Sequence, residues 1–162
     1  MTKAKLPKIS SLRNIEYYDF QETLDKLYAD SEKSKSFTRL MDYIISPQNI
    51  MLAYRNLKKN KGSKTAGVDK KTITHLEKWE PDKLIGYIQK RFEYYVAQPV
   101  RRVEIPKSNG KTRPLGIPTI MDRLIQQCVL QILEPICEAK FFQTQQWISP
   151  QQRSGTRYLT GI

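Results

Sequence analysis

An Asn-Gly pair at residues 109–110 follows a short stretch that alternates as a β-strand does. This pair is preferred in tight hairpin turns because both residues readily adopt positive φ. Residues 101–105 form the first stretch, and residues 111–117 would return as its partner. Pro114 and Pro118 lack the N–H that a central strand donates, so the second strand must be short or lie at an edge. The sequence therefore predicts one β-hairpin.

Elsewhere the apolar residues recur at helical spacing, which predicts amphipathic helices. Five helices are expected, beginning near Asp19, Phe37, Pro47, Pro81 and Thr119. Ser46 and Thr119 are suited to cap the third and fifth helices. Gly62 can end the third helix in a left-handed conformation, and Pro135 should bend or end the fifth. The expected fold class is α+β, mainly helical, with residues 61–72 as a loop.

The chain carries 28 Lys and Arg against 16 Asp and Glu, which gives a formal net charge of +12. Each contact with a phosphate releases condensed counterions, so a chain this basic favours a polyanionic partner such as RNA. A solvated basic surface without such a partner remains open as an alternative. Nine tyrosines leave room for base stacking as well as for core packing.

Several classes of function are poorly supported by the composition. No stretch is long and apolar enough to span a bilayer, so no membrane partner is expected. Cys128 and Cys137 lack metal-ligand spacing, and His75 is the only histidine. These facts argue against a disulfide scaffold, a zinc site and Ser-His or Cys-His catalysis. No metal or small-molecule cofactor is expected in this chain, and the cytoplasm is the expected compartment.

Residues 55–71 form a first basic cluster, which includes two glycines. Its cations are Arg55, Lys58, Lys59, Lys61, Lys64, Lys70 and Lys71, with Asp69 as the one acidic residue. Gly62 and Gly67 would let the backbone approach a bound strand, so that N–H groups meet phosphates along with the lysines. A solvated linker between two helices remains the alternative.

The predicted hairpin carries a second basic cluster, residues 101–113. Lys107 precedes the turn, and Lys111 and Arg113 follow it, so a rigid hairpin would present them as a fixed cationic rim. Arg suits bidentate contact with phosphate, and Lys acts as a point charge. An ordinary exposed hairpin, whose charged edges discourage pairing with other sheets, is equally consistent with this pattern.

Two long segments resemble a known family. PVRRVEIPKSNGKTRPLGIPTIMDRLIQQCVLQILEPICEAKF (residues 99–141) resembles the first blocks of group II intron reverse transcriptase/maturases. SPQNIMLAYRNLKKNKGSKTAGVDKKTI (residues 46–73) resembles the block that precedes them, and the similarity covers roughly residues 16–141 in order. The resemblance implies an N-terminal extension over residues 1–45 and an incomplete fingers region of a polymerase right hand over residues 46–141.

The same resemblance implies roles for individual residues. Lys107 and Arg113 would lie near the triphosphate of an incoming nucleotide, where cations neutralise charge on the pyrophosphate. The basic clusters and the resemblance together give the positions expected to bind RNA or template: Lys58, Lys59, Lys61, Gly62, Lys64, Gly67, Arg101, Arg102, Lys111 and Arg123. A surface salt bridge is an equally weighted role for Arg123. Asp69 and Asp122 are expected to be loop or capping residues rather than metal ligands.

The residues that would carry polymerase chemistry have no counterpart in this sequence. Polymerases of this class hold Mg²⁺ with aspartates that lie downstream, and this sequence has no Asp or Glu after Glu138. No catalytic or metal-binding residue is therefore assigned, and the chain alone is expected to be inactive. A separate palm and thumb fragment is a partner that could complete it. A stand-alone RNA-binding protein and a non-functional remnant remain alternatives.

Residues 142–162 depart from the family pattern and contain no acidic residue. If synonymous codons from Gln143 onwards are read one base over, they can spell KHSNGFRPN, which is the kind of sequence that the family has there. The single codon of Trp147 restricts this match. The hypothesis is a frameshift near residue 142 and an unstructured, out-of-frame tail. The nucleotide sequence of the gene would decide it.

Overall fold

The computed structural model describes residues 19–108 and 110–144, with side chains to Phe141. Its elements are α2 (Gln21–Glu32), α3 (Leu40–Ile44), α4 (Pro47–Lys59), the 3-10 helix η2 (Lys61–Lys64), α5 (Ile73–Leu76), α6 (Pro81–Glu93), β1 (Arg101–Pro106), β2 (Thr112–Ile117) and α7 (Ile120–Thr144). Strands β1 and β2 pair in antiparallel fashion. This confirms the α+β, mainly helical class, whereas the assignment to polymerase fingers stays a prediction.

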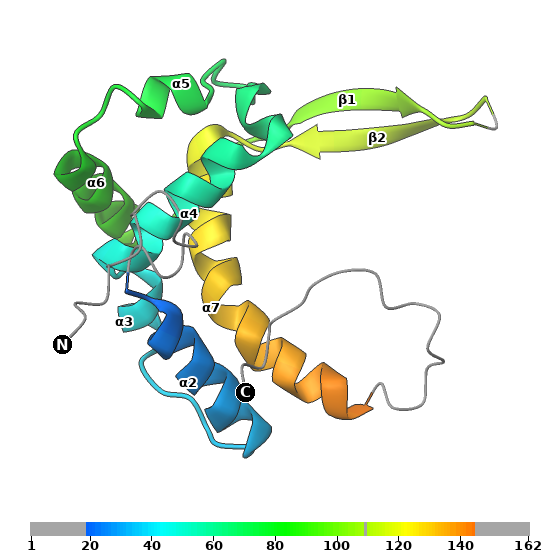
Figure 1. The fold of residues 1–162 in the computed structure, drawn as a ribbon. Helices are drawn as coiled ribbons and strands as arrows, with labels where there is room; N and C mark the ends of the chain where they lie inside the picture. The colour runs from blue at the N-terminus through cyan, green and yellow to red at the C-terminus, as the bar shows by residue number, and fades with distance from the viewer. Residues whose placement is uncertain (1–18, 109, 145–162) are drawn as a thin grey trace, which may run out of the picture.

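Helices α2, α3 and α4 pack on α7, while α6 packs on α4. Figure 1 shows α2 beside its C-terminal half and α4 crossing its N-terminal half, while the hairpin projects away from the helices. Ile50, Ile88, Leu124 and Ile132 are fully buried in one core, which also includes Leu24 of α2. Helix α2 therefore shares one core with α4 and α7, and the division at residues 45–46 into an extension and a fingers region stays a prediction.

A buried network of amides joins α4 to α7. Asn49 Nδ2 donates to the carbonyl oxygens of Ile44 at 2.9 Å and Cys128 at 3.0 Å. Gln131 Nε2 donates to Asn49 Oδ1 at 2.7 Å, and Asn56 Nδ2 donates to Gln131 Oε1 at 2.8 Å. Leaving any of these buried groups unpaired would be costly, so the network fixes the position of α4 along α7.

Local capping signals in the sequence were correct at two helix starts. The side chain of Ser46 accepts the Asn49 N–H, with Pro47 at the first position of α4. Thr119 Oγ1 accepts the Asp122 N–H at 3.2 Å and donates to Asp122 Oδ2 at 2.9 Å. Asp122 is thus the capping residue that the sequence predicted.

The structure differs from two expected helix ends. Of the bend or end expected at Pro135, the end is wrong, because α7 runs on to Thr144. Packing against α2 supports the helix there, and Ser31 Oγ of α2 donates to the Ile136 carbonyl at 2.7 Å. Gly62 is not a left-handed cap: α4 ends at Lys59, and Gly62 lies in η2, where its N–H donates to Asn60 Oδ1.

The loop predicted over residues 61–72 is more regular than expected. It begins with the single turn of η2, and α5 follows it directly. His75, which the sequence left without a role, accepts the Thr72 N–H at its Nδ1 and so helps to cap α5. The predicted tail starts within α7 at residues 142–144, and the rest of it, like residues 1–18, lies outside the described residues.

The hairpin forms at the predicted place with a different turn. The Lys107 N–H donates to the Lys111 carbonyl at 2.7 Å, and the Gly110 N–H donates to the Lys107 carbonyl at 3.1 Å. Three residues therefore separate the last hydrogen-bonded pair, Lys107 and Lys111, whereas a two-residue Asn-Gly turn would leave two. Gly110 has φ +75°, the left-handed conformation that the last residue of such a loop requires.

Gly67 brings two distant segments of backbone into direct contact. A Cβ added to this buried glycine would lie 2.8 Å from Thr119 Cα and 2.9 Å from the Pro118 carbonyl oxygen. Real side chains do not approach backbone atoms so closely. Only glycine therefore lets the segment after η2 lie against the turn that joins β2 to α7.

We predict that Gly67→Ala lowers the free energy of unfolding by about 1–3 kcal/mol, because the new methyl group must push backbone apart. Gly62→Ala is the matched control, since its Cβ would meet only Asn60 Oδ1 at 3.6 Å. It should be neutral or stabilise by up to about 1 kcal/mol, through a less flexible unfolded chain. Urea unfolding midpoints measure both changes. Equal midpoints for the two variants would contradict the close contact.

The two cysteines should differ in reactivity. Burial raises the pKa of the Cys128 thiol to about 12, whereas Cys137 is exposed on α7. Roughly one Cys128 thiol in 10⁴ would be ionised at pH 8, and the thiolate is the form that reacts. We predict that iodoacetamide alkylates Cys137 alone in the native protein and both cysteines in denaturant, as mass spectrometry would show. Native modification of Cys128 would contradict the packing described.

Candidate nucleic-acid interface

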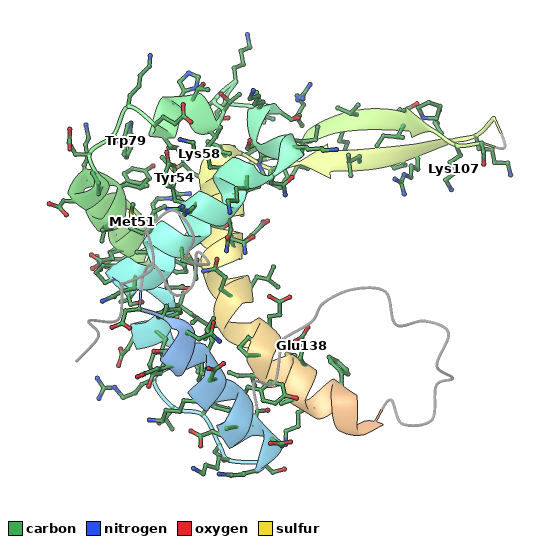
Figure 2. All side chains as sticks on the ribbon, in the orientation of Figure 1. Met51, Tyr54, Lys58, Trp79, Lys107 and Glu138 are labelled. Atoms are coloured by element: carbon green, nitrogen blue, oxygen red, sulfur yellow. The ribbon has the colours of Figure 1, made fainter. Side chains whose placement is uncertain are left out.

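The cross-strand register sorts the hairpin cations onto two faces. Ile105 pairs with Arg113 and Val103 with Leu115, and side chains of opposed residues share a face. Lys107 and Lys111 form the last pair before the turn. The face that carries Arg113 therefore has an apolar middle and cations toward the tip, where Figure 2 shows Lys107.

Arg102 lies on the opposite face of the hairpin. It pairs with Gly116, and Glu104 follows it on that face opposite Pro114. The structure thus separates Arg102 from the cations at the tip. Lys107, Lys111 and Arg113 are all exposed, so the tip presents three cations to solvent.

We use the name basic loop for residues 61–71, which follow α4. Lys61, Lys64, Lys70 and Lys71 are exposed on it. Hydrogen bonds within the loop define its shape. The Thr65 N–H donates to the Gly62 carbonyl, and the Lys71 N–H donates to Asp69 Oδ1 at 3.2 Å. Asp69 is therefore a loop residue, as the sequence predicted, and the lysines extend from a structured segment.

Two arginines from other elements hold the basic loop. Arg123, in the first turn of α7, donates through Nη1 to the Gly62 carbonyl at 2.7 Å and through Nη2 to the Thr65 carbonyl at 2.5 Å. Arg101, at the start of β1, donates through Nε to the Ala66 carbonyl at 2.9 Å. The hydrogen-bond partners of both arginines are backbone carbonyls rather than side-chain carboxylates.

Arg123 is also partly buried. Its guanidinium is partly withdrawn from water, which lowers its pKa from the ordinary value, with Asp69 acting in the opposite direction. Gly67, which was also predicted to contact RNA, lies instead against the chain's own backbone at Thr119. The sequence could not distinguish these internal contacts from contacts with a ligand, because both need the same residue types.

The last turn of α4 adds two lysines beside the basic loop. Lys58 Nζ lies 3.0 Å from Glu77 Oε1, which ties α4 to the residue after α5 and raises the pKa of Lys58. Lys59 is exposed. Figure 2 shows Lys58 on the same part of α4 as Tyr54, with Trp79 nearby. Lys58 and Lys59 extend the positive surface of the basic loop onto the helix.

A buried carboxylate stabilises the base of the hairpin. Asp122 Oδ2 accepts the Gln98 N–H at 3.2 Å, and Oδ1 accepts the Tyr95 hydroxyl at 3.3 Å. Arg91 Nη2 of α6 lies 3.6 Å from Oδ1. Burial, followed by the Asp122 charge, raises the pKa of Tyr95. The sequence identified the cap but missed Arg91 and Tyr95, since nothing in their local pattern indicates this partner.

The described residues offer no ligand set for a metal ion: among residues 19–108 and 110–141, no three His, Cys, Asp or Glu side chains are grouped for one. Asp122, the buried carboxylate, already accepts hydrogen bonds from several protein groups. These residues therefore do not fit the Mg²⁺ that the resemblance implies for complete relatives. No described helix is long and apolar enough to cross a membrane.

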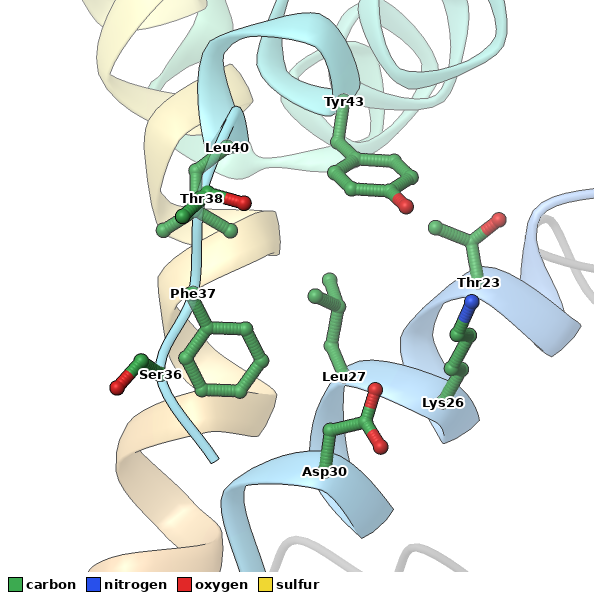
Figure 3. Close-up of a pocket in the computed structure, with 9 residues that line it drawn as sticks. All are labelled: Thr23, Lys26, Leu27, Asp30, Ser36, Phe37, Thr38, Leu40 and Tyr43. Carbon is green, nitrogen blue, oxygen red and sulfur yellow. The ribbon is translucent and has the colours of Figure 1, made fainter. Parts of the chain in front are cut away.

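A pocket of about 150 Å³ lies apart from both basic surfaces. Figure 3 shows Lys26 and Leu27 of α2 on one side and Phe37 and Tyr43 on the other. Asp30 at its edge pairs with Lys35 at 2.6 Å. No residue predicted to bind RNA or nucleotide lines this pocket, so the candidate interface consists of the basic loop, the end of α4 and the hairpin.

The chain is similar to proteins encoded in introns. It is 39% identical over 140 residues to the group II intron-encoded protein LtrA of Lactococcus lactis, which covers 85% of this chain and 23% of LtrA. It is 38% identical over 115 residues to protein YkfC of Escherichia coli K12, covering 70% and 30% of the two chains. An uncharacterized 91 kDa protein in the cob intron of Schizosaccharomyces pombe is 30% identical over 128 residues, which cover 75% of this chain and 16% of that protein.

No protein-family model matches the chain. The chain spans less than a third of the length of these relatives. The similarity nevertheless runs over most of this sequence, and it includes both the basic loop and the hairpin. By this homology the chain belongs to the family of group II intron-encoded reverse transcriptase/maturase proteins.

Proposed function

We propose that this chain supplies RNA-binding and nucleotide-binding elements of a group II intron reverse transcriptase, namely part of its fingers. In this proposal the basic loop and the end of α4 contact the phosphates of intron or template RNA. The tip of the hairpin, with Lys107 and Arg113, faces the triphosphate of a nucleotide. RNA is the partner that the net charge of +12 favours.

The observation that carries this proposal is the fixed attachment of the basic loop to the hairpin. Arg101 lies in β1 and donates to Ala66, while Gly67 lies against the turn that follows β2. Two cationic surfaces are thereby held at a constant spacing. A polyanion that contacts both would find its sites already arranged, which reduces the entropy lost on binding.

The hairpin tip has the chemistry that a triphosphate requires. Lys107, Lys111 and Arg113 are exposed, and Arg113 shares its face with Val103, Ile105 and Leu115. Cations can neutralise phosphate oxygens, while the apolar middle of the face can contact a base or ribose. This combination is the reason for proposing nucleotide binding at Lys107 and Arg113 rather than at Arg102.

We also propose that the chain alone does not polymerise DNA. Polymerisation needs carboxylates that hold two metal ions against the reacting oxygens, and this sequence has no Asp or Glu after Glu138. The activity of complete relatives would then depend on their remaining length. Extension of an RNA-templated primer by this chain with Mg²⁺ would overturn this part of the proposal.

We predict that Lys61→Ala/Lys64→Ala weakens RNA binding and makes it less dependent on salt. The slope of log K against log salt concentration should fall by about 0.7 to 0.9 for each phosphate contact that is lost. Fluorescence anisotropy with a labelled structured RNA at several salt concentrations measures both effects.

Lys26→Ala/Lys33→Ala is the matched control, since it removes the same charge from exposed positions at α2. This control should lose less RNA affinity than Lys61→Ala/Lys64→Ala does, and its slope of log K against log salt concentration should stay near that of the wild type. If both pairs weaken binding equally, bulk charge rather than the basic loop is responsible. If the wild-type chain binds no RNA at low salt, the proposed function is wrong.

A further inference from the structure

We infer that Arg123 is a positioning residue of the proposed RNA-binding surface, which sets the shape of the basic loop and does not contact RNA itself. The inference rests on the proposed function, because it names how that surface is built. It also divides the ten predicted RNA-binding residues into two groups with different physical roles.

The first reason is where the guanidinium group of Arg123 is directed. Both terminal nitrogens of Arg123 are used by loop carbonyls, those of Gly62 and Thr65. Its Nε is buried without a hydrogen-bond partner among the described residues. The fork that would otherwise grip a phosphate in bidentate fashion is therefore occupied by the chain's own backbone.

The second reason is the spacing of the three carbonyls. Gly62, Thr65 and Ala66 lie in one short segment, and their acceptors are met by arginines from β1 and from α7. A loop held at both of these points cannot move independently of the hairpin. Gly67, the next residue, completes the attachment by packing on Thr119.

The third reason is electrostatic. Carbonyl oxygens carry partial negative charge and would repel a phosphate that approached the loop. The two arginines bind the carbonyls of Gly62, Thr65 and Ala66, which neutralises this charge and leaves the exposed Lys61 and Lys64 as the outward groups. The lysines then act on the ligand, and the arginines act on the loop.

The decisive variant is Arg123→Lys. It keeps the positive charge, but a single ammonium lacks the planar fork that spans two carbonyls. If Arg123 positions the loop, this variant should weaken RNA binding about as much as Lys61→Ala/Lys64→Ala does. The triple variant Lys61→Ala/Lys64→Ala/Arg123→Lys should then bind RNA at most about twofold more weakly than Lys61→Ala/Lys64→Ala does. A displaced loop has already moved its lysines away from the RNA.

Direct contact with RNA predicts the opposite pattern. The effects of Arg123→Lys and of the lysine pair would then multiply, because each change would remove its own contact with RNA. That result overturns the inference, as does wild-type affinity of Arg123→Lys. Arg39→Lys is the control, since Arg39 is exposed and pairs with Asp42 at the surface. It should leave RNA affinity unchanged.

Hydrogen exchange separates a local positioning role from a general loss of stability. The Ser63 and Thr65 amides donate within the loop, to Asn60 and Gly62. In Arg123→Lys they should exchange faster, while amides in the middle of α7 keep wild-type protection. Faster exchange throughout the chain would mean that Arg123 only stabilises the fold, and unchanged loop exchange would also overturn the inference.

This measurement needs no RNA, so it keeps the two proposals distinguishable. The wild-type chain could fail to bind RNA while Arg123→Lys still makes the Ser63 and Thr65 amides exchange faster. The proposed function would then be wrong, but Arg123 would still position the loop. If the chain binds RNA and the loop amides do not change, the proposed function stands and the positioning role fails.

Discussion

The structure depends on one backbone contact, in which Gly67 lies directly against Pro118 and Thr119. Thr119 also caps α7, so this contact joins the basic loop, the end of the hairpin and the longest helix. A two-stranded hairpin is only marginally stable by itself. Its direction must therefore come from its base, where Arg101 bonds the loop and Asp122 bonds the segment that leads into β1. The positions of the basic loop and of the hairpin tip therefore depend on this junction.

The helical core determines how the junction is placed. Helix α4 leads into the basic loop, and α7 follows directly from β2, so the packing of these two helices sets where loop and hairpin meet. Asn49 and Gln131 fix that packing through buried amide hydrogen bonds, which specify one alignment where apolar contacts alone would allow several. The positions of the exposed lysines of the basic loop thus depend on buried, uncharged side chains.

Features governed by neighbouring residues were predictable from sequence. Ser46 and Thr119 cap helices as expected, and the hairpin lies between the expected strands, because capping and turn formation involve residues only a few positions apart. The sequence also indicated the lysines of the basic loop and the hairpin tip, and the resemblance over residues 16–141 pointed to the right family. Predictions failed where a distant partner intervened, as at Pro135, which α2 supports through Ser31.

The sequence by itself determined the mainly helical class, the single hairpin, the basic charge and the family. Only the tertiary structure decided which cations face outward and which bind the chain itself. Arg123 and Lys61 carry the same charge, yet Arg123 bonds loop carbonyls while Lys61 is exposed. The physical reason is that a side chain's partner depends on which backbone groups the fold brings within reach, and residues about 60 positions apart meet only after α4 packs on α7.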